Sequence, residues 1–179
     1  MSNEVQNKWI EYYENEATLS YTGAETPGGA VHTQIVISRK QLIEIFEIDT
    51  WLQQHLDISL NKLHRYYINV YRRGDELKGH RDFNLKDDTK FLNVIICLNP
   101  HANNNSGIEI DGEFVEDKFN RMVILDGARE HHKVIAPTDD VIRITLYLGF
   151  IETDTPTVWG KVHRGKNHWH LKDYRNGSK

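Results

Sequence analysis

Two short motifs, far apart in the chain, contain residue types that bind metal ions. His80 and Asp82 are separated by one residue, and two adjacent histidines, His131 and His132, follow much later. Alternate residues of an extended segment point to the same side, so His80 and Asp82 can face a common point. Two imidazoles and one carboxylate on one face of an octahedral iron leave positions open for other ligands, which suits oxygen activation. We therefore expect His80, Asp82 and one of the later histidines to bind a metal.

Two alternatives stay open at this point. Zinc can take the same ligands, because ligand identity alone does not decide which metal occupies a site. The motif is also weak by itself, since the chain has ten histidines. Adjacent residues of a strand point in opposite directions, so only one of His131 and His132 can be a ligand. Residue chemistry does not choose between them.

Helices are expected in the N-terminal third of the chain. Apolar residues at helical spacing predict a helix from about Arg39 to His55, with Ser38 and Gln41 forming a capping box at its start. A shorter helix is expected from about Val5 to Asn15. The segment from Thr22 to Ala30 contains Thr-Pro-Gly-Gly and is expected to be a turn or loop.

After Asp57 the sequence changes to short runs of β-branched and aromatic residues, separated by Gly, Asn and Asp clusters. Asp111-Gly112 is a strong hairpin signal between two of these runs. The expected strands are His64–Tyr71, Lys90–Leu98, Ile108–Ile110, Glu113–Val115, Met122–Leu125, His132–Ile135 and Val141–Phe150. Helices followed by strands predict an α+β chain whose β part is a sandwich or jelly roll.

Length and composition fit a single domain. The chain has 179 residues, of which 39% are hydrophobic and 27% charged, so it is neither disordered overall nor membrane-embedded by composition. No linker or repeat marks a boundary. We expect one domain over 1–179, with helical support over about 1–57, a β core over about 63–150 and a basic tail over about 157–179. The tail could cap the barrel, mediate a dimer or bind a partner.

Charge and targeting signals limit the partners. A net charge of −4 and a pI near 6.2 give no general attraction to nucleic acid or anionic membranes. No apolar run approaches the roughly 20 residues that span a bilayer, and the N-terminus lacks a signal-peptide layout, so a cytoplasmic location is expected. The single cysteine, Cys97, lies in an apolar run, which predicts a buried thiol rather than a nucleophile. The oligomeric state stays open.

Several landmarks around these motifs follow one another in a recognisable order. They are Tyr71 and Gly74 before His80 and Asp82, then Leu98-Asn99, Ser106-Gly107, Lys118-Phe119-Asn120-Arg121, Gly127, His132-Lys133-Val134 and Arg143-Ile144-Thr145. In this order, from about residue 63 to 150, the chain resembles the prolyl 4-hydroxylase-like branch of the 2-oxoglutarate- and iron(II)-dependent oxygenases. It departs from that family where Ser106 stands in place of the first residue of a frequent Gly-Gly pair.

The resemblance implies a double-stranded β-helix fold, an iron(II) cofactor, and 2-oxoglutarate and dioxygen as co-substrates. It implies His80, Asp82 and His132 as the metal ligands, because the family's His-x-Val matches His132 and Val134. The implied reaction is hydroxylation of an unactivated C–H bond with release of succinate and CO2. Related halogenases have a small residue at the position of Asp82, so hydroxylation is favoured over halogenation.

The resemblance also assigns the co-substrate's far carboxylate to Arg143. A planar guanidinium can hold a carboxylate with two bonds, and Thr145 on the same strand face can add another. Tyr71, and less directly Tyr66 or Tyr147, offers a phenol. The neighbours of Arg143 alternate between apolar and polar residues, so its face can line a polar pocket rather than lie on the surface.

Other classes are weighed against this interpretation. DNA-alkylation-repair oxygenases have a second arginine six residues after the first, where this chain has Gly149. A cupin-type metalloenzyme would need no 2-oxoglutarate. A non-enzymatic jelly-roll metal-binding module would have no need for a carboxylate clamp beside the metal.

The expected substrate is peptidyl proline, or alternatively a free amino acid or another small metabolite. The loops expected to decide between them are Thr22 to His32, Asn84 to Lys90 and His101 to Gly107, because substrate preference in such enzymes lies in variable loops.

Overall fold

The computed structural model describes residues 2–22, 32–56, 58–75, 77–82, 90–99, 105–127, 129–152 and 169–170. Within them the elements are α1 (Asn3–Asn15), β1 (Thr18–Thr22), β2 (His32–Val36), α2 (Arg39–Phe46), α3 (Ile48–Leu56), a 3-10 turn (Leu60–Lys62), β3 (Leu63–Tyr71), β4 (Leu77–His80), β5 (Lys90–Cys97), β6 (Gly107–Ile110), β7 (Glu113–Glu116), β8 (Met122–Asp126), β9 (His132–Ile135), β10 (Arg143–Glu152) and β11 (Trp169–His170). The turn expected from Thr22 to Ala30 lies outside the described residues except for Thr22, which ends β1, and so do most of the three loops and most of the tail. No helix in the described part combines the length and apolar character needed to cross a membrane.

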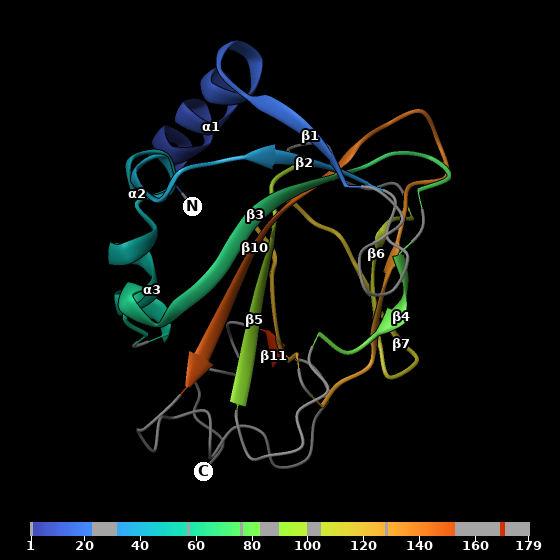
Figure 1. The fold of residues 1–179 in the computed structure, drawn as a ribbon. Helices are drawn as coiled ribbons and strands as arrows, with labels where there is room; N and C mark the ends of the chain where they lie inside the picture. Colours follow the sequence, from blue (N-terminus) through green and yellow to red (C-terminus); the bar gives the residue numbers. More distant parts are fainter. Residues whose placement is uncertain are drawn as a thin grey trace.

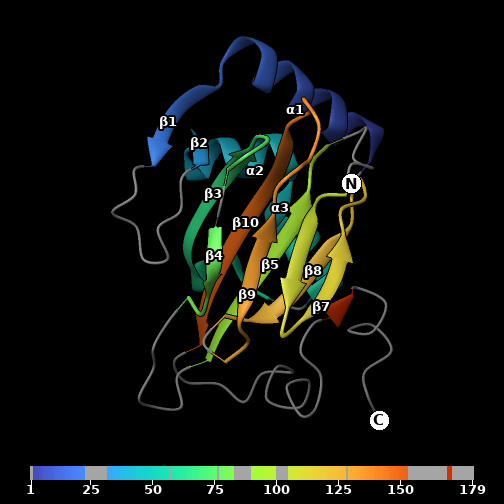
Figure 2. The same cartoon turned by 90° about the vertical axis from the view of Figure 1, so that its right-hand side faces the viewer.

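The strands form two sheets. The larger has the order β1-β2-β3-β10-β5-β8-β11 and the smaller the order β4-β9-β6-β7, and every pairing is antiparallel. Figure 1 shows the three helices on one side of the larger sheet and the smaller sheet on its other side. Figure 2 shows β4 and β9 running beside each other in front of the larger sheet. The predicted jelly roll, a double-stranded β-helix with N-terminal supporting helices, is confirmed.

The two faces of the larger sheet differ in chemistry. In β10, Ile144, Leu146 and Leu148 are buried in the main apolar cluster, which also contains the inward side chains of the three helices. The alternate residues Arg143 and Thr145 are buried as well, but on the opposite face, toward the smaller sheet. The alternation predicted for this strand is therefore present, and it gives the jelly roll a polar interior.

The N-terminal helix covers the sheet with one apolar stripe. Val5, Trp9 and Tyr12 are its buried residues, at the spacing of one helical face. Ser2 caps the helix by accepting a hydrogen bond from the Val5 N–H at 3.3 Å. The Trp9 ring packs against the Phe46 ring of α2, with 5.6 Å between centroids. The helices thus cover one face of the larger sheet and leave its opposite face to the smaller sheet.

The single helix predicted from Arg39 to His55 is wrong, because the chain forms two helices there. The Ser38–Gln41 capping box is present, but Glu47 adopts a left-handed conformation with φ 50° and ends α2. Its carboxylate pairs with Lys8 of α1 at 2.9 Å. The break reorients the apolar stripe, so that Phe46 before it and Ile48 after it are both 2% exposed.

Four short strands were not predicted: β1, β2, β4 and β11. In β4, Leu77–His80 lacks β-branched residues, and one of its members is Gly79. A Cβ atom at Gly79 would lie 2.1 Å from Cε1 of His131, so a side chain at this position would overlap the His131 ring where it now lies. β10 also begins at Arg143, two residues later than the predicted Val141.

Candidate metal centre

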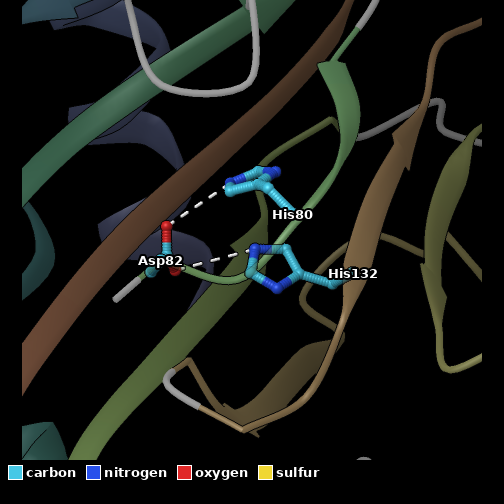
Figure 3. A group of neighbouring side chains, drawn as sticks. All are labelled: His80, Asp82 and His132. Atoms are coloured by element: carbon cyan, nitrogen blue, oxygen red, sulfur yellow. Dashed lines mark ion pairs between the residues drawn. The ribbon is translucent and has the colours of Figure 1, made fainter. Parts of the chain in front are cut away.

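The structure brings the side chains of His80, Asp82 and His132 together. One ligand atom from each lies within 4.8 Å of the other two. Nε2 of His80 is 3.5 Å from Oδ1 of Asp82, and Nε2 of His132 is 3.6 Å from Oδ2 (Figure 3). Atoms that each lie about 2.1 Å from one ion are about 3 Å apart, so the two nitrogen–oxygen distances need to shorten by roughly 0.5 Å and the widest separation by less than about 2 Å to bring all three around a metal. The donor set and its spacing fit a single ion.

The pairing of β4 with β9 positions the two histidines. His80 lies opposite His132, while Leu77 lies opposite Val134, so β4 has one residue more than β9 between these pairs. Such a bulge changes the direction of the following side chain. The next turn of chain is fixed by the Asp82 N–H, which donates to the Gly127 carbonyl at 2.7 Å. The smaller sheet therefore delivers both imidazoles to one point, beside the end of β8.

The second nitrogen of each imidazole contacts a backbone carbonyl. Nδ1 of His80 is 2.9 Å from the Lys78 oxygen, and Nδ1 of His132 is 3.3 Å from the Glu130 oxygen. A carbonyl can only accept, so we assign the proton to Nδ1 in both rings, which leaves a lone pair on each Nε2. This is how metal-binding histidines are usually oriented. Both lone pairs then face Asp82.

His131 and His132 lie in different environments. His132 is 4% exposed and belongs to the cluster. His131 is exposed, and its ring packs against Gly79 on β4. Its main chain is held by Asp111, whose Oδ1 accepts the His131 N–H at 3.1 Å. Of the two neighbours, the structure places only His132 beside Asp82.

Electrostatics favour the metal-binding protonation states of Asp82 and His132. Asp82 is buried, which raises its pKa, but His80, His132, Arg65 and Asn93 together lower it well below the usual range. Burial lowers the pKa of His132, so its ring stays neutral at neutral pH. Burial also acts to lower the pKa of His80, but its contacts with Asp82 and the Lys78 carbonyl raise it overall. A cation at this centre replaces the proton that His80 would otherwise take up.

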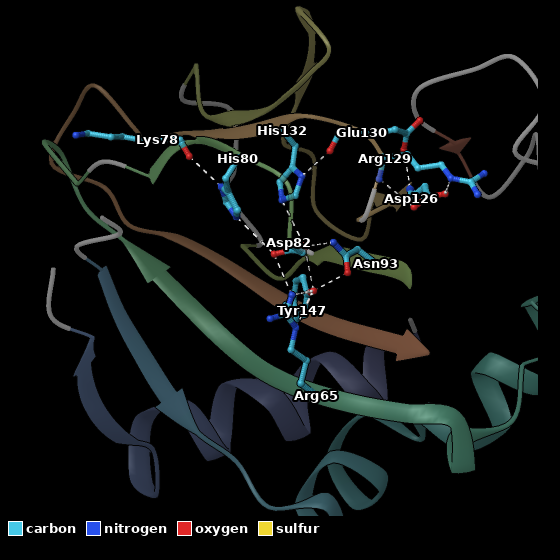
Figure 4. A network of polar contacts seen from close by, with 10 residues as sticks. All are labelled: Arg65, Lys78, His80, Asp82, Asn93, Asp126, Arg129, Glu130, His132 and Tyr147. Atoms are coloured by element: carbon cyan, nitrogen blue, oxygen red, sulfur yellow. Dashed lines mark hydrogen bonds and ion pairs between the residues drawn. The ribbon is translucent and has the colours of Figure 1, made fainter. Parts of the chain in front are cut away.

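Asp82 is held by side chains of the larger sheet (Figure 4). Nη2 of Arg65 on β3 is 2.9 Å from Oδ1 of Asp82. Nδ2 of Asn93 on β5 donates to Oδ2. Both carboxylate oxygens therefore have a partner before any metal binds, and their direction is fixed.

The Tyr147 hydroxyl on β10 completes this network. It accepts from Nη2 of Arg65 at 2.8 Å and lies 2.5 Å from Oδ1 of Asn93. It is also 3.3 Å from Oδ2 of Asp82, but a phenol has one proton, and the shorter contact places that proton on the bond to Asn93. Burial raises the Tyr147 pKa well above its usual value, so the donor is retained. The ring stacks on Tyr67 with 4.6 Å between centroids.

A second polar cluster lies at the other end of the inner face. Nε of Arg143 is 2.5 Å from Oδ2 of Asp117, and Nη2 is 3.2 Å from Oδ1. Ser106 donates to the same Asp117 oxygen at 2.9 Å. Arg143 is 3% exposed and Asp117 is 7% exposed. The sequence predicted a buried cation here, but not that a carboxylate of the chain itself pairs with it.

The remaining predicted residues lie between or beside these clusters. Thr145 is 1% exposed and stands in β10 between Arg143 and Tyr147, opposite Asn69 of β3. The Tyr71 ring lies 5.2 Å from Cζ of Arg143. Burial raises the pKa of the Tyr71 phenol, so it remains a hydrogen-bond donor at neutral pH. The inner face is thus polar from the metal centre to Arg143.

Cys97 is buried as predicted. Burial, with the nearby Asp117 charge, raises its pKa to about 11. Its thiol is therefore protonated at neutral pH and is not a nucleophile.

Comparison with known proteins identifies the fold. No protein-family model and no curated protein matches the chain. Among solved structures, a prolyl 4-hydroxylase from Pseudomonas putida is similar with a TM-score of 0.54, 18% identity, and coverage of 86% of this chain and 88% of that one. AviO1 from Streptomyces viridochromogenes Tue57 has a TM-score of 0.55, 14% identity, and coverage of 88% of each chain. The viral collagen prolyl hydroxylase of Paramecium Bursaria Chlorella virus-1, in complex with 2-oxoglutarate, has a TM-score of 0.52, 12% identity, and coverage of 86% and 92%.

This chain has the fold of the prolyl 4-hydroxylases. The resemblance inferred from the motifs is therefore confirmed for the fold.

Three residues of the site were missed by sequence reasoning: Arg65, Asn93 and Asp117. Asn93 gave a signal, because it is a polar residue inside the apolar run FLNVIICL, and it is 0% exposed. Arg65 and Tyr67 are two residues apart on β3, so their side chains lie on the same face of the strand, the face on which Tyr67 stacks on Tyr147. Asp117 gave no signal, since its partners Ser106 and Arg143 are distant in sequence.

Proposed function

We propose that this protein is an iron(II)- and 2-oxoglutarate-dependent dioxygenase that hydroxylates an unactivated C–H bond and releases succinate and CO2. One observation carries the proposal: two imidazole Nε2 atoms and one ionised carboxylate converge at one point inside a jelly roll. The backbone carbonyls of Lys78 and Glu130 contact Nδ1 of the two imidazoles and so fix the orientation of the rings. A structural zinc site would use four protein ligands, and the described residues provide three.

The chemistry of the donors fits iron(II). His80, Asp82 and His132 would hold the ion on one side and leave its other positions to dioxygen and the 2-oxo acid. The bound metal supplies oxygen activation coupled to decarboxylation of the 2-oxo acid. The protein keeps Asp82 ionised at neutral pH, because the ion pair with Arg65 and the hydrogen bond from Asn93 stabilise the charged form.

The inner face supplies groups for the co-substrate. Arg143 retains N–H groups beyond those that it donates to Asp117, and these can bind the distal carboxylate of 2-oxoglutarate. Thr145 and Tyr71 offer hydroxyl groups near it. All three side chains are at most 3% exposed, so bound co-substrate would be shielded from bulk water there.

A prolyl peptide is the first substrate to test. Two of the solved structures with this fold are named as prolyl hydroxylases, which supports this choice. Free amino acids belong in the same screen, because the loops expected to select the substrate vary independently of the core.

The test uses a matched pair of variants, His132→Ala and His131→Ala. Under anaerobic conditions, the wild type with iron(II) and 2-oxoglutarate should show the weak visible charge-transfer band of the chelate. In air it should convert 2-oxoglutarate into succinate, with peptides and amino acids screened for added oxygen by mass spectrometry. His132→Ala should lose both signals, and His131→Ala should keep them. A folded, iron-loaded wild type with neither signal would contradict the proposal.

A further inference from the structure

The ion pair between Arg143 and Asp117 is buried at the end of the inner face. Asp117 follows β7 directly, and Arg143 is the first residue of β10, so the pair joins the smaller sheet to the larger one. The Asp117 N–H donates to the Ser106 carbonyl at 2.9 Å, and the Ser106 hydroxyl donates to Asp117 Oδ2. The carboxylate is therefore fixed by both main chain and side chain.

Among the residues that the structure describes, Asp117 is the hydrogen-bond partner of the guanidinium, and it occupies one edge. It contacts Nε and Nη2, which form the side edge of the planar group. The end edge, formed by Nη1 and the second hydrogen of Nη2, still points two N–H groups in parallel. A carboxylate ligand can bind there with two hydrogen bonds. It would then share one positive charge with Asp117.

Sharing the charge weakens the attraction for an anion. The pair has no net charge, so a second carboxylate gains the hydrogen bonds of Arg143 but meets the negative charge of Asp117. Two carboxylates on adjacent edges of one guanidinium lie about 6 Å apart, where their repulsion at an effective dielectric constant of about 20 amounts to about a hundredfold in affinity.

We propose that Asp117 is a specificity-determining residue, which limits the preference of this site for 2-oxo acids with a second carboxylate. The inference rests on the proposed function, because it assigns the end edge of Arg143 to the co-substrate. Asp117 reduces the advantage of 2-oxoglutarate over a 2-oxo acid of the same shape with an uncharged tail. The co-substrate is then selected by hydrogen bonding and shape more than by charge.

The probes are 2-oxoglutarate and 5-methyl-2-oxohexanoate, in which an isopropyl group replaces the distal carboxylate. Their dissociation constants are measured by anaerobic calorimetry on the iron(II)-loaded protein, without turnover. In the wild type we expect 2-oxoglutarate to bind about tenfold more tightly than the neutral-tailed acid. In Asp117→Asn, which keeps an acceptor for Arg143 and Ser106 but loses the charge, 2-oxoglutarate should bind about a hundredfold more tightly than it does to the wild type. The neutral-tailed acid should change less than about threefold.

The ratio between the two ligands separates the possible outcomes. If Asp117 only holds Arg143 in place, Asp117→Asn weakens 2-oxoglutarate, and that result overturns the inference. A ratio well above a hundredfold in the wild type overturns it too, even if the variant does not fold. Ser106→Ala is the matched control, because it removes a hydrogen bond to Asp117 but keeps the charge, and its ratio should equal that of the wild type. Failure of the iron-loaded wild type to bind either acid would instead contradict the proposed function.

Discussion

Replacing Tyr147 by phenylalanine removes one oxygen atom from the network behind Asp82. The ring keeps its stack on Tyr67, so the change is confined to the hydroxyl. That hydroxyl accepts from Arg65 and donates to Asn93, and both of these partners contact Asp82. The substitution therefore tests whether a group with no role as a ligand sets the metal affinity of the centre.

The expected size follows from the partners that are left behind. Asn93 is 0% exposed, so its Oδ1 loses its donor in a place that water does not reach, which costs about 1 to 3 kcal/mol. The side chain of Arg65 is 30% exposed and keeps its ion pair with Asp82, so the loss of its hydrogen bond to the Tyr147 hydroxyl adds less than about 1 kcal/mol. We expect the metal-free variant to be destabilised by about 2 to 3 kcal/mol. Since the groups behind metal ligands typically contribute 10- to 100-fold, metal affinity should fall about tenfold.

Two measurements check this prediction. Urea denaturation of the metal-free protein gives the change in unfolding free energy, and anaerobic iron(II) titration gives the change in affinity. Tyr12→Phe is the control, because Tyr12 is a buried tyrosine of α1 on the other side of the larger sheet. It should leave metal affinity unchanged whatever its effect on stability. Equal iron affinity in Tyr147→Phe and wild type would refute the view that the network positions Asp82.

Two further predictions concern residues near the centre. Burial raises the folded-state pKa of Cys97 to about 11, against 9.0 for a free thiol. The unfolded chain therefore releases the thiol proton first, and the folded state loses stability as pH rises from about 9 to 11. At pH 9 iodoacetamide should label Cys97 far more slowly in native protein than in urea, and equal rates would contradict its burial. Gly79→Ala should displace β4 and weaken iron binding, because the new Cβ would overlap the His131 ring. His131→Ala in the same chain should restore binding. An iron titration in which the double variant binds iron no more tightly than Gly79→Ala alone would show that the contact between Gly79 and His131 is unimportant.

Much of the architecture could be predicted because its signals are local. The alternation in β10 predicted that Arg143 and Thr145 share the inner face, and His80-x-Asp82 predicted two donors that face a common point, although β4 ends at His80 and Asp82 lies in the bend that follows it. The helix break was not predictable from apolar spacing, since it depends on one residue, Glu47, in a left-handed conformation and on Lys8 from another helix.

The partners of the site were harder to predict, because register decides them. Arg65 reaches Asp82 only because β3, β10 and β5 align in one particular way. The pairing of Asp117 with Arg143 depends on how the smaller sheet closes over the larger one. Sequence patterns give the face of a strand on which a residue lies, but not which residue of another strand lies opposite.

The residues of the centre come from both sheets, and this affects how easily the two sheets separate from each other. The histidines belong to strands of the smaller sheet, whereas Arg65, Asn93 and Tyr147 belong to the larger one, and Asp82 contacts both groups. Separating the sheets at this end therefore requires breaking the contacts of Asp82. A ligand that binds only the closed form adds its binding free energy to that opening. Amide hydrogens of β4 and β9 should accordingly exchange with solvent more slowly when a metal ion is added, because a bound ion would link the two halves of the jelly roll.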